Sequence, residues 1–190
     1  MKRLVIIALA LVLVAGMGIG TASAANSLEQ GNINISVGMG DSVFSHNTTP
    51  EVVDVVNNVV DLSARYLITK DLAIVGGFGL EVGSGDWDST YFSFTGGVRK
   101  YLKTADFAPF VGGQLTYATL TTENAVGVKQ DDLSAMDLSA MFGAEYFVGA
   151  QFSLEGSVGI GFGQVNDDLA NTDKTYFGTR TVGVKANFYF

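Results

Sequence analysis

The chain has 190 residues, of which 47% are hydrophobic, with 24 glycines, 2 prolines and a mean hydropathy of +0.30. Its formal net charge of −8 argues against a nucleic-acid partner, because phosphate backbones attract basic proteins. It has no cysteine, which excludes both a disulfide framework and lipid anchoring through an acylated cysteine.

The first 24 residues have the order of a secretory signal peptide. The segment MKRLVIIALALVLVAGMGIGTASA begins with two basic residues, continues as an apolar stretch and ends in small residues at Ala22-Ser23-Ala24. An uncleaved membrane anchor is the alternative interpretation. We predict a cleaved signal peptide at 1–24, followed by one domain at 25–190.

Strand-like alternation fills the rest of the chain. After residue 24 no apolar run approaches the roughly 18 residues that a membrane-spanning helix needs. Apolar and polar residues instead alternate, which predicts strands with one apolar face, most of them close to the 9–11 residues with which a tilted strand crosses a bilayer. The predicted strands are 31–41, 59–69, 72–82, 92–102, 111–117, 135–146, 152–162 and 182–190.

The connections between these strands alternate in length. The short ones lie near 70–71, 104–106 and 149–150, and the longer polar ones at 42–58, 83–90, 120–132 and 163–174. An even strand count with short turns at one end and long loops at the other is the plan of an outer-membrane barrel. The predicted fold class is all-β: an eight-stranded antiparallel transmembrane β-barrel in the outer membrane of a Gram-negative-type bacterium, with periplasmic termini and extracellular loops. A soluble, lipocalin-like barrel with its apolar face inward is the alternative.

The predicted register also assigns residues to the lipid-facing surface. Its only outward basic residues are Lys100 and Arg180, each near a rim, where a charge costs little. Aromatic residues are expected to form two girdles at the membrane interfaces. The predicted girdles are Tyr66, Tyr101, Tyr146 and Phe190 at the periplasmic rim, and Tyr91, Phe92, Tyr117, Phe162 and Tyr176 at the outer rim.

The last strand ends on an aromatic ring. In VGVKANFYF, one face carries Val184, Ala186, Phe188 and Phe190. This alternation before a terminal Phe resembles the signal that outer-membrane barrels present to their assembly machinery. We therefore expect that machinery to be a partner of the carboxy-terminal strand.

One stretch carries a more specific family resemblance. The segment GGVRKYLKTADFAPFVGGQLTY at 96–117 has Gly-x-Arg-x-Tyr, a short turn and then Pro-aromatic-x-Gly. With it, the span from about Gln30 to Phe190 resembles the small eight-stranded outer-membrane barrels, the group that contains OmpX, OmpW and the membrane domain of OmpA. Gln-Leu-Thr stands at 114–116 where relatives often carry a further Gly-x-Gly pair.

Charged residues gather on the predicted inner face. In its periplasmic half this face holds Arg65, Arg99, Glu145, Glu155 and Lys185. Farther out it holds Asp61, Glu81 and Asp137. Charges in such a place are tolerable only when they are paired. We predict a mutually neutralising plug that closes the lumen, and a gated polar path in which the pairs switch partners is the alternative.

The predicted loops are rich in acidic residues. Solvation at the cell surface explains them, with outer-membrane lipid and lipopolysaccharide as neighbours, and a rim that collects divalent cations is the alternative. Trp87, in the predicted loop 83–90, is the candidate for contact with a partner or the membrane. We expect a monomer.

No catalytic, cofactor or metal site is predicted. The single histidine, His46, lies in the predicted loop 42–58, and no spacing implies an acid that would orient it. The predicted function is non-enzymatic, in envelope integrity and surface interaction. The alternatives are a narrow porin-like channel or a conduit for small or hydrophobic solutes, and a lipid-modifying hydrolase centred on His46.

Overall fold

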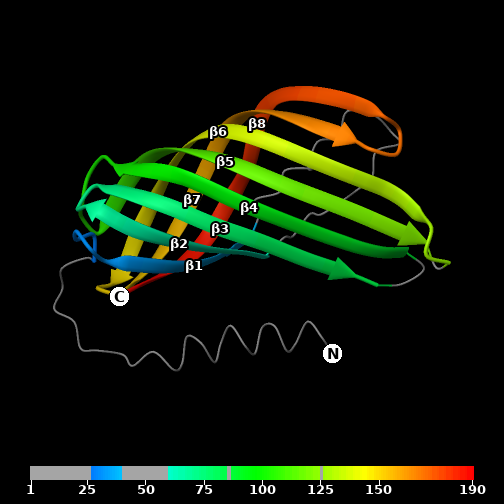
Figure 1. Ribbon diagram of the computed structural model, residues 1–190. Helices are drawn as coiled ribbons and strands as arrows, with labels where there is room; N and C mark the ends of the chain where they lie inside the picture. The colour runs from blue at the N-terminus through cyan, green and yellow to red at the C-terminus, as the bar shows by residue number, and fades with distance from the viewer. Residues whose placement is uncertain (1–26, 40–59, 85–86, 125) are drawn as a thin grey trace.

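The computed structural model describes residues 27–39, 60–84, 87–124 and 126–190 (Figure 1). The predicted signal peptide, the predicted loop 42–58 and His46 lie outside these residues. So do the side chains of Asp61, Trp87 and Arg180, although their backbones belong to strands. None of the described residues forms a helix long and apolar enough to cross a membrane.

The described residues form a closed antiparallel barrel of eight strands in chain order (Figure 1). The ring closes where β1 pairs with β8, Asn34 lying opposite Tyr189 and Met39 opposite Val184. The predicted all-β, eight-stranded fold is therefore confirmed. The strands are β1 Ile33–Met39, β2 Val60–Thr69, β3 Leu72–Gly83, β4 Trp87–Tyr101, β5 Phe107–Asn124, β6 Lys129–Gly149, β7 Phe152–Asp167 and β8 Thr172–Tyr189.

Side-chain alternation explains why the outer surface of the barrel is apolar and its lumen polar. On β6, Leu138 and Phe142 are 62% and 55% exposed on the outer surface, whereas Ser139 and Glu145 are buried inside. Successive side chains of a strand point to opposite faces, so the apolar set lines the outside and the polar set the lumen. The soluble, lipocalin-like alternative is wrong, because it requires the opposite polarity.

The exposed apolar residues form a continuous belt around the barrel. On β5 the belt extends from Phe107 to Tyr117, and on β7 from Phe152 to Phe162. Each stretch has about the number of residues with which a tilted strand crosses a bilayer. Lys100, on the outer face of β4, pairs with Asp71 at the turn end of the barrel, as its predicted position near a rim implies.

Three predicted long loops are largely strand. The segments 83–90, 120–132 and 163–174 were expected to be irregular, but β5 continues to Asn124 and β6 begins at Lys129, and these strands project far past the belt (Figure 1). Beyond the belt both faces of a strand can be polar, so hydrophobic alternation ends while backbone pairing continues. Thr119, for example, lies opposite Ser134, and threonine favours extended structure.

The predicted aromatic girdles are correct in part. Tyr91 and Tyr101 are each 2% exposed, and the Tyr176 hydroxyl donates a hydrogen bond to Asp137 inside the barrel at 2.9 Å. All three were wrongly assigned to the lipid-facing surface. For Tyr91 and Tyr101, height was considered without the face to which their strand position directs them. For Tyr176, the β7–β8 register shifts between Ser157 and Gly159, which reverses the faces of β8 beyond that point. The remaining predicted girdle residues are exposed on the outer surface: Tyr66, Phe92, Tyr117, Tyr146, Phe162 and Phe190.

Candidate functional site

The lumen is crossed by ion pairs between strands that are not neighbours. Arg65 on β2 binds Glu145 on β6, with Nη1 and Oε2 3.0 Å apart, and its Nη2 lies 3.3 Å from Oε2 of Glu155 on β7. Arg99 on β4 binds Glu155 at two points, 2.7 and 2.8 Å long. Both arginines and both glutamates are at most 5% exposed. We call Arg65, Arg99, Glu145 and Glu155 the lumen cluster.

Arg65 is the centre of this cluster. Its Nε donates to Oδ1 of Asn34 at 2.9 Å, and its Nη2 donates to Asn187 and to the Ser36 hydroxyl. Its Nη1 also donates to the Tyr101 hydroxyl. A guanidinium has five N–H donors in a rigid fork. Partners from several strands therefore surround one side chain and hold it in the middle of the lumen.

Glu145 is equally well satisfied although it is fully buried. Its Oε2 accepts from Arg65 and from the Tyr101 hydroxyl, the latter at 2.8 Å. Its Oε1 accepts from the Tyr189 hydroxyl at 2.6 Å and from the Ser153 hydroxyl. An ionised carboxylate only accepts hydrogen bonds, and here both oxygens have two donors. The burial cost of this charge is thus offset locally.

Arg99 has an aromatic partner as well as an ionic one. Its guanidinium carbon lies 3.8 Å from the centre of the Phe110 ring, in cation–π geometry. The Phe110 ring in turn packs edge-on against Tyr101, with their centroids 6.0 Å apart. The charged cluster therefore rests directly on aromatic side chains.

These aromatic side chains belong to an apolar cap at the turn end of the barrel. A segment before β1 helps to seal it: the Ser27 hydroxyl donates to the Ala150 carbonyl at 2.6 Å, and Gly31 N–H donates to the Leu67 carbonyl at 2.8 Å. Leu28, between them, is 3% exposed. The cap consists of Leu28, Leu67, Ala73, Tyr101, Ala108, Phe110, Phe147 and Tyr189.

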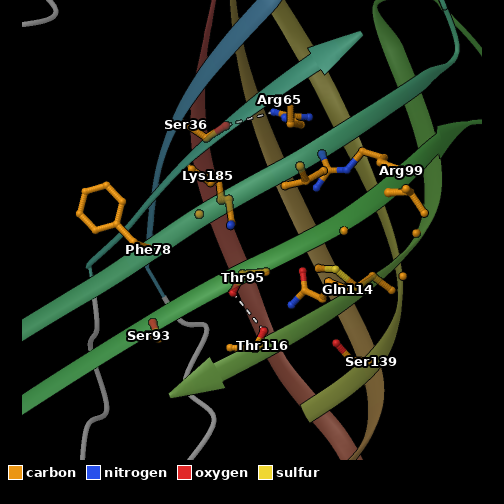
Figure 2. Close-up of a pocket in the computed structure, with 18 of the residues that line it drawn as sticks. Ser36, Arg65, Phe78, Ser93, Thr95, Arg99, Gln114, Thr116, Ser139 and Lys185 are labelled. Carbon is orange, nitrogen blue, oxygen red and sulfur yellow. Dashed lines mark hydrogen bonds between the residues drawn. The ribbon is translucent and has the colours of Figure 1, made fainter. Parts of the chain in front are cut away.

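On the other side of the lumen cluster the barrel holds a polar cavity (Figure 2). Arg65, Arg99 and Glu155 line its floor. Hydroxyl and amide side chains line its walls, and Thr95 and Thr116 are hydrogen-bonded to each other at 3.0 Å. The wall residues of this kind are Ser36, Ser63, Ser93, Thr95, Gln114, Thr116 and Ser139.

The structure brings together most of the predicted lumen charges. Arg65, Arg99, Glu145 and Glu155 form the lumen cluster, in which each arginine is paired with a glutamate. Lys185 lies opposite Glu155 in the β7–β8 register and lines the cavity. Asp137 also lines the cavity and binds Tyr176. Glu81 faces inward near the far end of β3, where its Oε2 is buried without a hydrogen-bond partner among the described residues.

Several members of the network were missed from the sequence. Tyr101 and Tyr189 both bind Glu145, and Asn34, Ser153 and Asn187 bind the same charged groups. A signal for them was available. Each lies on the inward face of its strand, and Tyr101 and Tyr189 stand two residues after Arg99 and Asn187 respectively. Polar side chains at the inward positions nearest a charge are its natural partners.

The other predicted functional residues lie elsewhere. Val184 and Phe190 face outward with 59% and 47% exposure, and Phe188 and Ala186 occupy the same face. The backbones of Phe190 and Ile33 exchange two hydrogen bonds, which complete the ring at the rim. Trp87 begins β4, where its backbone lies opposite Asn124. Among the described residues no group of three or more acidic or histidine side chains is placed to hold a metal ion.

The site is a network of mutually paired charges. The charges of the lumen cluster have ionic and hydrogen-bonding partners, and its members come from opposite walls. An eight-stranded barrel has an interior just wide enough for side chains to fill it. The cluster therefore cross-links the barrel wall, and the apolar cap lies next to it.

Comparison with known proteins supports the same architecture. No family model and no curated protein matches the chain. The N-terminal β-barrel domain of Pseudomonas aeruginosa OprF matches with 16% identity and a TM-score of 0.53, over 85% of this chain and 98% of that one. Yersinia pestis Ail, solved in complex with the heparin analogue sucrose octasulfate, matches with 16% identity and a TM-score of 0.54, over 85% and 99%.

A third solved structure extends the comparison. OprG from Pseudomonas aeruginosa, an outer-membrane protein, matches with 12% identity and a TM-score of 0.52, over 85% of this chain and 97% of that one. At such identities the likeness concerns the fold, and it covers nearly the whole of each barrel. The chain therefore has the fold of the small eight-stranded outer-membrane β-barrels.

Proposed function

We propose that this protein resides in the outer membrane as a closed, non-enzymatic barrel that serves envelope integrity and surface interaction. The observation that carries this proposal is the ion-paired cluster across the lumen. Arg65 and Glu145 meet at 3.0 Å from opposite walls, and the apolar cap lies next to them. A path for solutes would require both layers to open.

The apolar belt supports the membrane location. Large apolar side chains such as Phe94, Leu138 and Phe142 are more than half exposed on the outer surface. Soluble monomers rarely expose contiguous apolar patches of this extent. In the expected orientation the short turns and the termini face the periplasm, and the long β5–β6 and β7–β8 hairpins project from the cell. Lipid and lipopolysaccharide then contact the belt, and the assembly machinery recognises the last strand.

The projecting hairpins supply the surface for interaction. The turn at 168–171 lies beside β6, since Asp168 N–H donates to the Asp132 carbonyl at 3.0 Å. Val126 and Leu169, at the two tips, are 81% and 51% exposed. The acidic residues around them outnumber the basic ones, which suits a basic partner with apolar side chains. The charged residues of the two tips whose side chains the structure describes are Glu123, Lys129, Asp132, Asp167, Asp168, Asp173 and Lys174.

Single-channel recording of the refolded chain in planar bilayers tests the proposal. A closed barrel gives no conductance steps at any voltage that the bilayer tolerates. Discrete steps in the wild-type chain, altered in size or frequency by Glu145→Gln, contradict the closed barrel. They support instead the second candidate, a narrow channel, which the polar cavity above the lumen cluster favours.

Shortening one hairpin tests the surface role separately. Thr119 and Ser134 lie opposite each other, so an Asn-Gly turn can join them in place of residues 120–133. The apolar belt remains complete in this variant. Vesicles that carry it should attach less to an oligolysine-coated surface than wild-type vesicles do, while gel mobility still shows a folded barrel. Equal attachment rules out this hairpin as the contact surface.

A further inference from the structure

The polar cavity is lined by hydroxyl and amide groups that make no hydrogen bond to another described residue. Ser63, Ser93 and Ser139 are 7%, 8% and 4% exposed, and none of their hydroxyls bonds to another described residue. Gln114, which is half-buried, lines the same cavity and also has no such bond (Figure 2). These side chains come from β2, β4, β5 and β6. We call Ser63, Ser93, Gln114 and Ser139 the serine pocket.

Water or a bound molecule in the cavity must therefore provide the hydrogen-bond partners of these groups. Buried polar side chains in proteins nearly always have a hydrogen-bond partner, and an unmet one is costly. Thr95 and Thr116, on the same wall, satisfy each other at 3.0 Å. The serine pocket differs from this pair because its hydroxyl and amide groups line the cavity without a partner among the described residues.

The side chains that line the cavity favour a neutral molecule that can both donate and accept hydrogen bonds. Hydroxyl and amide groups offer both functions. The described charges in and directly below the cavity balance, since Arg65, Arg99 and Lys185 are matched by Asp137, Glu145 and Glu155. A charged guest would lose its hydration without meeting a surplus of opposite charge. A small neutral molecule with several hydroxyl groups can form hydrogen bonds with the lining and does not lose the hydration of a charge.

The dimensions restrict the guest to a few heavy atoms. The space open to the centres of water molecules is about 40 Å³. Each water occupies roughly 10–15 Å³ on this measure, so the cavity holds about three waters. The lumen cluster and the cap close the turn end, which leaves the hairpin end as the route of exchange. A guest of this size replaces the waters rather than adding to them.

We propose that the serine pocket is a binding site for a small neutral polyol with two or three carbons, which displaces ordered water in the middle of the barrel. The site depends neither on conduction nor on the projecting hairpins. It is thus independent of the function proposed above.

Nuclear magnetic resonance of the refolded, isotope-labelled barrel in micelles tests this site. Ethylene glycol is titrated as the probe, and sorbitol, which is too large, is titrated in parallel. We expect ethylene glycol to shift the amide signals of the residues around Ser93, Gln114 and Ser139 in a saturable manner. Sorbitol is expected to leave these signals in place at the same concentrations.

Two variants locate the effect, and one serves as a control. Ser139→Val and Gln114→Leu each remove a hydrogen-bonding group from the pocket, and each should weaken the saturable response at least threefold. Ser134→Val changes a residue of the same strand on the outer face and should leave the response unchanged. Gel mobility confirms that each variant is folded, and Gln114→Leu serves if Ser139→Val does not fold.

Four results overturn the proposal. The first is a response to ethylene glycol that stays linear and is spread over the whole barrel. The second is an equal response to sorbitol. The third is an unaltered response in a folded Ser139→Val or Gln114→Leu variant. Water as the only occupant, seen as cross-peaks to bound water with no shift by the polyol, contradicts it as well.

Discussion

Arg65 and Glu145 stand on opposite walls of the barrel, on β2 and β6, and their side chains meet at 3.0 Å in the lumen. Each is at most 2% exposed, and each has further hydrogen bonds to neutral side chains. A contact between opposite walls restrains the whole ring rather than one pair of strands. We therefore expect the stability of the barrel to depend on this pair.

Replacing Arg65 should destabilise the barrel strongly. Arg65→Met leaves Glu145 buried without its cation, and breaking a buried pair from one side costs about 3–5 kcal/mol. The free energy of unfolding in urea, measured on protein refolded in lipid vesicles, provides the test. Lys100→Met is the matched control, because Lys100 pairs with Asp71 on the exposed rim, where such pairs contribute little. Equal losses in the two variants would contradict the structural role of the cluster.

Gly143 should not tolerate even one added methyl group. A Cβ at this inward position would lie 2.5 Å from both the Gly156 carbonyl oxygen and Cζ of Phe110, the ring beneath Arg99. We expect Gly143→Ala to lower the free energy of unfolding by about 1–3 kcal/mol, the usual cost of overpacking. Gly156→Ala is the control, because nothing lies within 4 Å of its added Cβ. Similar losses in both variants would point to a general intolerance of the strands instead.

A charge in the middle of the apolar belt should impair insertion into lipid. Phe142 faces outward at mid-height on β6 and is 55% exposed. Phe142→Arg should cost about 2–4 kcal/mol on folding into vesicles, whereas Ser134→Arg, beyond the belt, should cost roughly 0–1 kcal/mol. Urea titrations of both variants in vesicles give these differences. If Phe142→Arg folds as stably as Ser134→Arg, the belt does not face lipid.

The carboxy-terminal ring should matter for assembly in cells more than for stability. Phe190 is 47% exposed on the outer surface, and its backbone hydrogen bonds to Ile33 do not depend on its side chain. Phe190→Ser should therefore refold in detergent almost as the wild type does, but reach the outer membrane in smaller amounts. Phe162→Ser, which removes another exposed aromatic ring at the other rim, should reach the membrane normally. An equal defect in the two variants would remove the special role of Phe190.

The turn between β2 and β3 should show a defined pH dependence. Hydrogen bonds from the Lys100 ammonium and the Thr69 hydroxyl lower the pKa of Asp71 below its ordinary value. The stabilisation that this carboxylate contributes is thus present above the ordinary pKa, and it is lost as the pH falls through the lowered one. Lys100→Met should raise the pKa of Asp71, as followed by carboxyl carbon resonances. A pKa that does not move in this variant would show that the contact is absent in solution.

The alternation of the sequence was sufficient to predict the number of strands, the face on which most side chains lie and the presence of charges in the lumen. Alternation is a local property, since neighbouring side chains of a strand point to opposite faces whatever the strand pairs with. That is why Arg65, Arg99, Glu145 and Glu155 could be placed inside before their partners were known. It is also why the predicted strands end where the apolar belt ends, although β5 and β6 continue beyond it.

Only the tertiary structure decided which lumen residues meet. Contacts between β2 and β6, or between β4 and β7, depend on the tilt and stagger of all the strands between them, and these are properties of the closed ring. Tyr101 and Tyr189 reach Glu145 for this reason, although they stand far from it in the sequence. The serine pocket likewise exists because strands separated along the chain direct unsatisfied side chains into one space.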